Sequence, residues 1–191
     1  MLRLRCPTLT AAALAAALIV AINPVHARGQ AAPNCTPRSP LLERVEPTVP
    51  PKPVPNVAFQ DAQGAEPTIA DFAGSGVVLN FWATWCAPCV HEMPALDALK
   101  ADLEEAGIEV LAVSEDTTGM KSIKQFYKVN GIENLEMLHD PDGKLAHALG
   151  VHALPTTLLI DDQGREVARI VGAAPYGEDD MRTFIENCVG G

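Results

Sequence analysis

The sequence predicts an α/β fold in which a central mixed sheet is flanked by helices. After residue 55, short apolar runs rich in β-branched residues alternate with segments whose apolar residues recur at helical spacing. The chain has 191 residues, which suits one domain plus a short extension. We therefore expect residues 56–191 to form a single α/β domain.

Residues 1–27 have the pattern of an export signal. Arg3 and Arg5 precede an apolar run over residues 9–22, and Ala27 ends a segment at which cleavage would fit. The run has 14 residues, whereas about 20 span a hydrocarbon core. We therefore expect a cleaved signal peptide, with an inner-membrane anchor as the alternative. Either one delivers the remaining chain to a periplasmic or other extracytoplasmic compartment, where disulfides persist.

The charge balance excludes one class of partner. The chain carries a net charge of -10, and because residues 1–27 contain two arginines and no acidic residue, the remainder carries -12. An acidic surface repels the phosphates of nucleic acids and the head groups of anionic lipids. We therefore expect no nucleic acid partner.

Residues 28–55 form an extension rich in proline. Eight prolines lie between residues 33 and 55, too many for a helix or a central strand. We expect this stretch to be extended, largely peripheral, and to precede the folded domain.

The order of the apolar patterns predicts the order of helices and strands in the domain. Residues 76–83 are nearly continuous in apolar residues, as in a central buried strand. A helix is expected over residues 90–103, kinked near Pro94. The elements expected after it are a strand at 109–114, a helix at 120–129, a short strand at 135–138, a turn at 140–143, a short helix at 144–149, a hairpin of strands at 154–161 and 165–171, and a last helix at 178–189.

Cys86 and Cys89 lie where the buried strand gives way to a helix. Two intervening residues let the pair close a small disulfide ring with little backbone movement. Cys86 lies at the expected helix N-terminus, where free amide groups and the helix dipole favour a thiolate, so we expect it to be the nucleophile. Cys89 lies one turn further in and would attack the mixed disulfide to release the reduced substrate. Pro88 stiffens this turn.

Two other interpretations of the pair are weaker. A zinc site would need a second pair of ligands, but Cys35 and Cys188 stand alone and far apart in sequence. A static disulfide would not explain why the pair follows a strand and opens a helix. We therefore expect no metal and no cofactor other than the redox-active dithiol or disulfide.

Two motifs together resemble a known family. Residues 80–89 read Asn-Phe-Trp-Ala-Thr-Trp-Cys-Ala-Pro-Cys, and residues 154–157 read Leu-Pro-Thr-Thr. Both are similar to the TlpA/ResA/CcmG group of thioredoxin-like proteins. The resemblance covers residues 56–189 and implies a thioredoxin-like fold with a strand and a helix inserted between residues 109 and 138.

The resemblance also implies a substrate-binding surface. Pro155 would be cis and face the cysteine pair, and the backbone of Leu154 would pair with an extended segment of the substrate protein. Trp85, beside the first cysteine, would contact the same substrate. From the residues alone, Pro155 could equally be an ordinary trans residue at a strand edge.

Proton transfer in this group is expected to differ from that in plain thioredoxins. Those proteins carry a buried Asp where this chain has Asn80, and an amide cannot exchange a proton. The ResA-like branch implies a Glu three residues after the second cysteine as the acid and base, which here is Glu92. One helical turn brings Glu92 alongside Cys89. The alternative is a glutamate that merely faces solvent.

The remaining cysteines suggest a second bridge. Cys6 lies in the signal segment, which leaves Cys35 and Cys188 outside the motif. Some TlpA-like proteins carry a comparable extra disulfide, so we expect a structural bridge worth about 5 kcal/mol in the chain-entropy model. Two free thiols would be disfavoured in an oxidising compartment.

The resemblance implies an enzyme that reduces disulfides in exported client proteins. The clients would be the haem-binding cysteines of apocytochrome c or a copper-site cysteine pair in respiratory oxidase assembly. Electrons would come from a membrane thiol-disulfide carrier.

Three alternatives differ in chemistry. A general disulfide oxidant would use the same pair in the opposite direction, since the direction depends on the reduction potential. Sco-type copper chaperones use CxxxC with a distant His, whereas Cys86 and Cys89 have two residues between them. Peroxiredoxins use PxxxTxxC, and Leu79 and Ala83 occupy the Pro and Thr positions.

Overall fold

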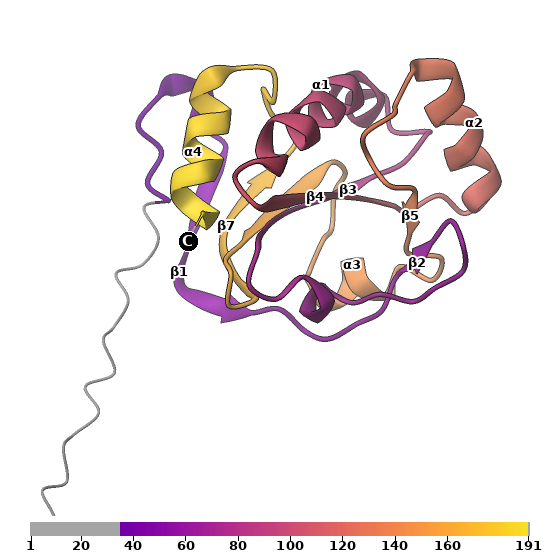
Figure 1. Cartoon of the computed structure of the whole chain (residues 1–191), viewed down its shortest axis with the longest axis horizontal. Helices are drawn as coiled ribbons and strands as arrows, with labels where there is room; N and C mark the ends of the chain where they lie inside the picture. The colour runs from indigo at the N-terminus through magenta and orange to yellow at the C-terminus, as the bar shows by residue number, and fades with distance from the viewer. Residues whose placement is uncertain (1–34, 191) are drawn as a thin grey trace, which may run out of the picture.

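The computed structural model describes residues 35–190, so the expected signal segment and Cys6 lie outside the described residues. Seven strands form one mixed sheet in the order β1-β7-β6-β3-β4-β5-β2, which confirms the predicted fold class (Figure 1). β3 is parallel to β4 and antiparallel to β6. The strands are β1 Val45–Pro53, β2 Gln60–Asp61, β3 Gly76–Trp82, β4 Ile108–Ser114, β5 Leu138–His139, β6 Thr156–Ile160 and β7 Arg165–Val171.

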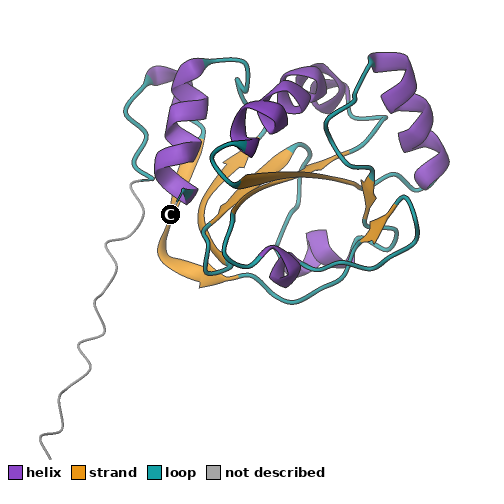
Figure 2. Ribbon diagram, in the orientation of Figure 1, coloured by secondary structure: helices purple, strands orange, loops and turns teal. Residues whose placement is uncertain are grey.

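Helices cover both faces of the sheet (Figure 2). The α-helices are α1 Ala87–Glu104, α2 Met120–Asn130, α3 Lys144–Ala148 and α4 Asp179–Val189, and two short 3-10 helices are η1 Pro40–Leu42 and η2 Ile69–Phe72. Helices α1, α2 and α4 pack on one face, and α3 and η2 on the other. Within residues 35–190, no helix is both long and apolar enough to cross a membrane.

Strand β3 lies at the centre of the sheet because nearly all of its residues are apolar. All seven of its residues are buried. Val78 and Trp82 pack against α1, α2 and α4, whereas Leu79 and Phe81 point to the opposite core under η2 and α3. Burial on both faces fixes the register of this strand, because a slip of one residue would exchange the two sets of side chains. The residues that follow its carboxyl end are therefore held in a defined place.

Part of the Pro-rich stretch belongs to the sheet. Strand β1 lies at the sheet edge and pairs antiparallel with β7, with an irregularity between Pro47 and Lys52. An edge strand needs ladder hydrogen bonds on one side only, so prolines are tolerated there. Val45–Pro53 is extended, as expected, whereas Pro40–Leu42 forms the 3-10 helix η1. The sheet nevertheless includes residues that the sequence analysis assigns to an extension before the domain.

The strand expected at residues 135–138 is shorter and lies later, as β5. The carboxylate of Asp97 on α1 accepts hydrogen bonds from the backbone N–H groups of Glu133, Asn134 and Leu135. A side chain therefore satisfies the backbone donors that a strand would have paired with a neighbour.

Cys35 and Cys188 form a disulfide in this structure. Both residues are buried, and their Cα atoms are 4.6 Å apart. The bond joins the segment before η1 to the last turn of α4, although 153 positions separate the two cysteines in the sequence.

Candidate active site

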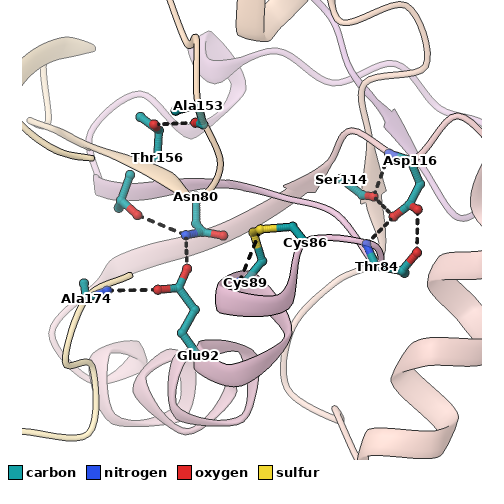
Figure 3. Close-up of a disulfide and its surroundings, with 11 residues drawn as sticks. Asn80, Thr84, Cys86, Cys89, Glu92, Ser114, Asp116, Ala153, Thr156 and Ala174 are labelled. Atoms are coloured by element: carbon teal, nitrogen blue, oxygen red, sulfur yellow. Dashed lines mark hydrogen bonds between the residues drawn. A yellow bond between two sulfur atoms is a disulfide. The ribbon is translucent and has the colours of Figure 1, made fainter. Parts of the chain in front are cut away.

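The cysteine pair lies at the junction of β3 and α1. Cys86 is the N-cap of α1, with an extended backbone, and is bonded to Cys89 in the first turn. The sulfur of Cys86 accepts a hydrogen bond from the Cys89 N–H at 3.4 Å (Figure 3). A donor at that sulfur and the helix N-terminus both favour a thiolate on Cys86 once the bond is reduced. Cys86 is 6% exposed and Cys89 is 0% exposed, so Cys86 is the more accessible of the two.

The loop that carries Cys86 is held by a side chain from the end of β4. The carboxylate of Asp116 accepts hydrogen bonds from the backbone N–H of Thr84 at 2.9 Å and from its hydroxyl at 2.6 Å (Figure 3). It also accepts one from the Ser114 hydroxyl at 2.8 Å. The imidazole of His139 donates to the Asp116 carbonyl. These contacts fix the loop two residues before Cys86, and they were not predicted from the sequence.

Two of the three expected substrate-binding residues, Trp85 and Leu154, share a groove with Cys86. The Leu154–Pro155 bond is cis, and the Pro155 carbonyl accepts a hydrogen bond from the Gly172 N–H at 2.8 Å. Leu154 and Trp85 line one groove with Cys86, and Trp85 is 66% exposed. The other residues of the groove are Pro88, Glu115, Ala146, Val151, His152 and Ala153. The structure thus brings Trp85, Cys86 and Leu154 to one open surface that is continuous with the disulfide.

Glu92 is buried beneath the cysteine pair and does not face solvent. One carboxylate oxygen accepts a hydrogen bond from Asn80 Nδ2 and the other from the Ala174 N–H, each at 3.0 Å (Figure 3). Burial raises the pKa of Glu92 to about 7, although these two donors act in the opposite direction. The carboxyl group can therefore both gain and lose a proton near neutral pH.

Asn80 connects Glu92 to a second set of polar groups. Its Nδ2 also donates to the Thr157 hydroxyl at 3.0 Å, and that hydroxyl is hydrogen-bonded to the hydroxyl of Tyr176. Burial, with the nearby Glu92 charge, raises the pKa of Tyr176. Tyr176 could not be predicted from the sequence, because no pattern marks a tyrosine in a loop that only the fold brings next to Thr157 of β6.

A second acid, Glu115, lines the groove on the side of Cys86. Burial and the adjacent Asp140 raise the pKa of Glu115 to about 8. Glu115 was not predicted as a site residue from the sequence. Its position directly after β4 was the available signal, because the carboxyl ends of neighbouring parallel strands meet at one edge of a sheet.

Because Glu92 is buried, we expect the free energy of unfolding to depend on pH. The folded form of Glu92 has a higher pKa than the unfolded form, so the free energy of unfolding falls as pH rises from about 5 through 7. In Glu92→Gln, the free energy of unfolding should fall by about 3 kcal/mol less than in wild type over this pH range. Urea denaturation at several pH values measures it, with Glu104→Gln, exposed on the same helix, as the control. Parallel curves for wild type and Glu92→Gln would contradict the expectation.

Comparison with known proteins gives one consistent result. A family model described as the AhpC/TSA family matches residues 50–168. The thiol-disulfide oxidoreductase ResA of Bacillus thuringiensis subsp. konkukian is 37% identical over 121 residues, which are 63% of this chain and 69% of that protein.

Solved structures agree in fold. A proposed thiol:disulfide interchange protein DsbE from Chlorobium tepidum matches with a TM-score of 0.66 and 28% identity, over 73% of this chain and 97% of that one. The exposed lipoprotein thioredoxin Etrx1 of Streptococcus pneumoniae matches with a TM-score of 0.60 and 27% identity, over 69% and 98% of the respective chains.

Proposed function

The chain belongs to the AhpC/TSA family and, within it, to the ResA-like thiol-disulfide oxidoreductases, and on this premise we propose that it reduces disulfides in exported client proteins. The observation that carries the proposal is the position of the Cys86–Cys89 disulfide. It lies at the start of α1, with only the Cys86 side open to a groove that a polypeptide can enter.

The proposed cycle balances as an exchange of two disulfides. The Cys86 thiolate attacks a client sulfur, the client S–S bond breaks, and a mixed disulfide forms while the departing client sulfur takes up a proton. Cys89 then loses its proton and attacks Cys86, which releases the second client sulfur as a thiol. The client gains two electrons and two protons, and the enzyme is left as the Cys86–Cys89 disulfide.

We assign the proton of Cys89 to Glu92. The carboxyl group lies one helical turn from Cys89, is buried, and titrates near pH 7, where an acid and base is most effective. In Glu92→Gln, the pH dependence of Cys89 alkylation should lose its inflection near pH 7. An unchanged profile would remove Glu92 from the mechanism.

The proposal places the enzyme in an extracytoplasmic compartment. The Cys35–Cys188 disulfide supports this placement, since such bonds persist in oxidising surroundings. There the pair needs a dedicated supply of electrons, for which a membrane thiol-disulfide carrier is the proposed donor. The proposed clients are the haem-binding cysteine pairs of apocytochrome c or the copper-site pair of a respiratory oxidase.

Trapping in the native cell tests both the client and the reaction. We expect Cys89→Ser to accumulate mixed disulfides, because the attack that releases the client is lost. Mass spectrometry should identify clients joined to Cys86 through one member of a cysteine pair. The Cys86→Ser/Cys89→Ser double variant is the matched control. If Cys89→Ser carries no protein adduct beyond that control, the reductase function is wrong.

The direction of electron transfer has its own measurement. Rapid acid quenching and alkylation of wild-type cells report whether the pair is a dithiol or a disulfide at steady state. A reductase should be held largely as the dithiol and become oxidised when the electron donor is depleted. A pair that stays a disulfide under both conditions would instead identify a general oxidant.

A further inference from the structure

The side-chain oxygen of Asn80 is a buried acceptor without a hydrogen-bond partner among the described residues. Asn80 is 0% exposed. Buried polar atoms in folded proteins nearly always have a partner, so an exception at a reaction site points to a group that changes during the reaction.

The hydrogen bonds donated by Nδ2 determine the orientation of the Asn80 carboxamide. Its Nδ2 donates to both Glu92 and Thr157, which uses both amide hydrogens. Turning the amide over would direct its oxygen at the Glu92 carboxylate, an acceptor facing an acceptor, whenever Glu92 is ionised. The oxygen therefore occupies the opposite side, and Figure 3 shows it directed towards the disulfide of Cys86 and Cys89.

Reduction of that disulfide supplies the missing donor. A dithiol electron donor gives two electrons and becomes a disulfide, while the Cys86–Cys89 bond breaks and Cys86 becomes the thiolate. Of the two protons that the donor loses, one passes to the sulfur of Cys89 and the other is released to solvent. We propose that the Cys89 S–H then donates to Asn80 Oδ1, so that Asn80 is the acceptor that holds the resolving cysteine as a thiol until a client arrives. This inference rests on the proposed function of the pair and extends it to a residue that does not itself exchange protons.

The link to Glu92 gives Asn80 a second effect. An ionised Glu92 polarises the amide through its Nδ2 end and makes Oδ1 a stronger acceptor, because hydrogen bonds in a chain reinforce one another in a buried site. The thiol of Cys89 is then favoured over the thiolate most strongly when Glu92 is ionised and can accept a proton. Protonation of Glu92 weakens the polarisation, so the hydrogen bond to Cys89 weakens with it.

Infrared spectroscopy tests the bond directly, because a hydrogen-bonded S–H absorbs at a lower wavenumber than a free one. The full chain is used with Cys6→Ser and Cys86→Ser, so that Cys89 is its single thiol while Cys35 and Cys188 remain bonded. We expect Asn80→Ala to shift the Cys89 S–H band to a higher wavenumber. Thr157→Val removes the other neutral partner of Asn80 and should shift the band less than Asn80→Ala does. An unmoved band in Asn80→Ala would overturn the inference.

If Asn80→Ala folds poorly, a second variant and a second measurement test the same hydrogen bond. Asn80→Ser keeps a small polar group but removes the carboxamide oxygen, and it should shift the band in the same direction. With both active cysteines present, Asn80→Ser should also lower the equilibrium constant for reduction by dithiothreitol about 5-fold, the size of one net hydrogen bond. Thr157→Val should stay closer to wild type. Equal constants for Asn80→Ser and wild type would contradict the proposal.

Failure of the Asn80 hydrogen bond can be distinguished from failure of the proposed reductase activity. If wild type reduces insulin but the band is the same in the Asn80 variants, only the Asn80 inference is wrong. If wild type reduces no protein disulfide, the proposed function is wrong whatever the band shows.

Discussion

Replacing Cys86 by serine is expected to lower the turnover of a protein disulfide, with dithiothreitol as electron source, by more than about 1,000-fold. Cys86 is the N-cap of α1 and the less buried cysteine of the pair, so among the described residues it is the thiol expected to begin the exchange. A serine hydroxyl forms no disulfide with a client. The insulin precipitation assay measures the loss.

Cys89→Ser should fail at a different step. It should retain the first attack and stall as one mixed disulfide per enzyme, since Cys89 is needed only to release the client. The double variant Cys35→Ala/Cys188→Ala is the control, because that disulfide lies at α4, away from the groove, and its turnover should match wild type in folded protein. Substantial turnover by Cys86→Ser would show that another group is the nucleophile.

The Cys35–Cys188 disulfide is expected to contribute about 2–5 kcal/mol to the free energy of unfolding. It closes a loop of 153 positions between the start of the described chain and the end of α4. In the chain-entropy model, a long loop limits the unfolded chain more than a short one. Urea denaturation of Cys35→Ala/Cys188→Ala against wild type should reveal this loss as a lower midpoint.

The short ring of the active site is the internal comparison. Cys86→Ala/Cys89→Ala removes a disulfide with a sequence separation of 3 and should cost less stability than Cys35→Ala/Cys188→Ala. The opposite order, or an unchanged midpoint without the Cys35–Cys188 bond, would contradict a structural role for that bond.

The elements around the cysteine pair could be predicted because their signals are local. The apolar run over residues 76–83 indicates a doubly buried strand by itself, and the CxxC motif at its end marks the junction with a helix. Glu92 could be placed beside Cys89 because one turn of helix separates them. Its burial, and hence its raised pKa, depends on packing by residues far away in sequence.

The features that could not be predicted depend on contacts between distant segments. Asp116 reaches Thr84 only because β3 and β4 are parallel neighbours in a particular register. Tyr176 lies in the segment after β7, and only folding brings its hydroxyl to the Thr157 hydroxyl. The Pro-rich β1 belongs to the sheet because β7 offers it an edge, and nothing in its own composition indicates that partner.

The single-turnover stoichiometry of the reduced enzyme shows whether Cys86 and Cys89 form the redox centre. Wild type with Cys86 and Cys89 as thiols is mixed with an equal amount of a peptide disulfide, quenched with acid, alkylated and mapped by mass spectrometry. We predict one peptide disulfide reduced for each Cys86–Cys89 disulfide formed, with the Cys35–Cys188 bond unchanged throughout. Reduction of the peptide without formation of the Cys86–Cys89 bond, or no reduction by the dithiol enzyme, would contradict the assignment of this pair as the redox centre.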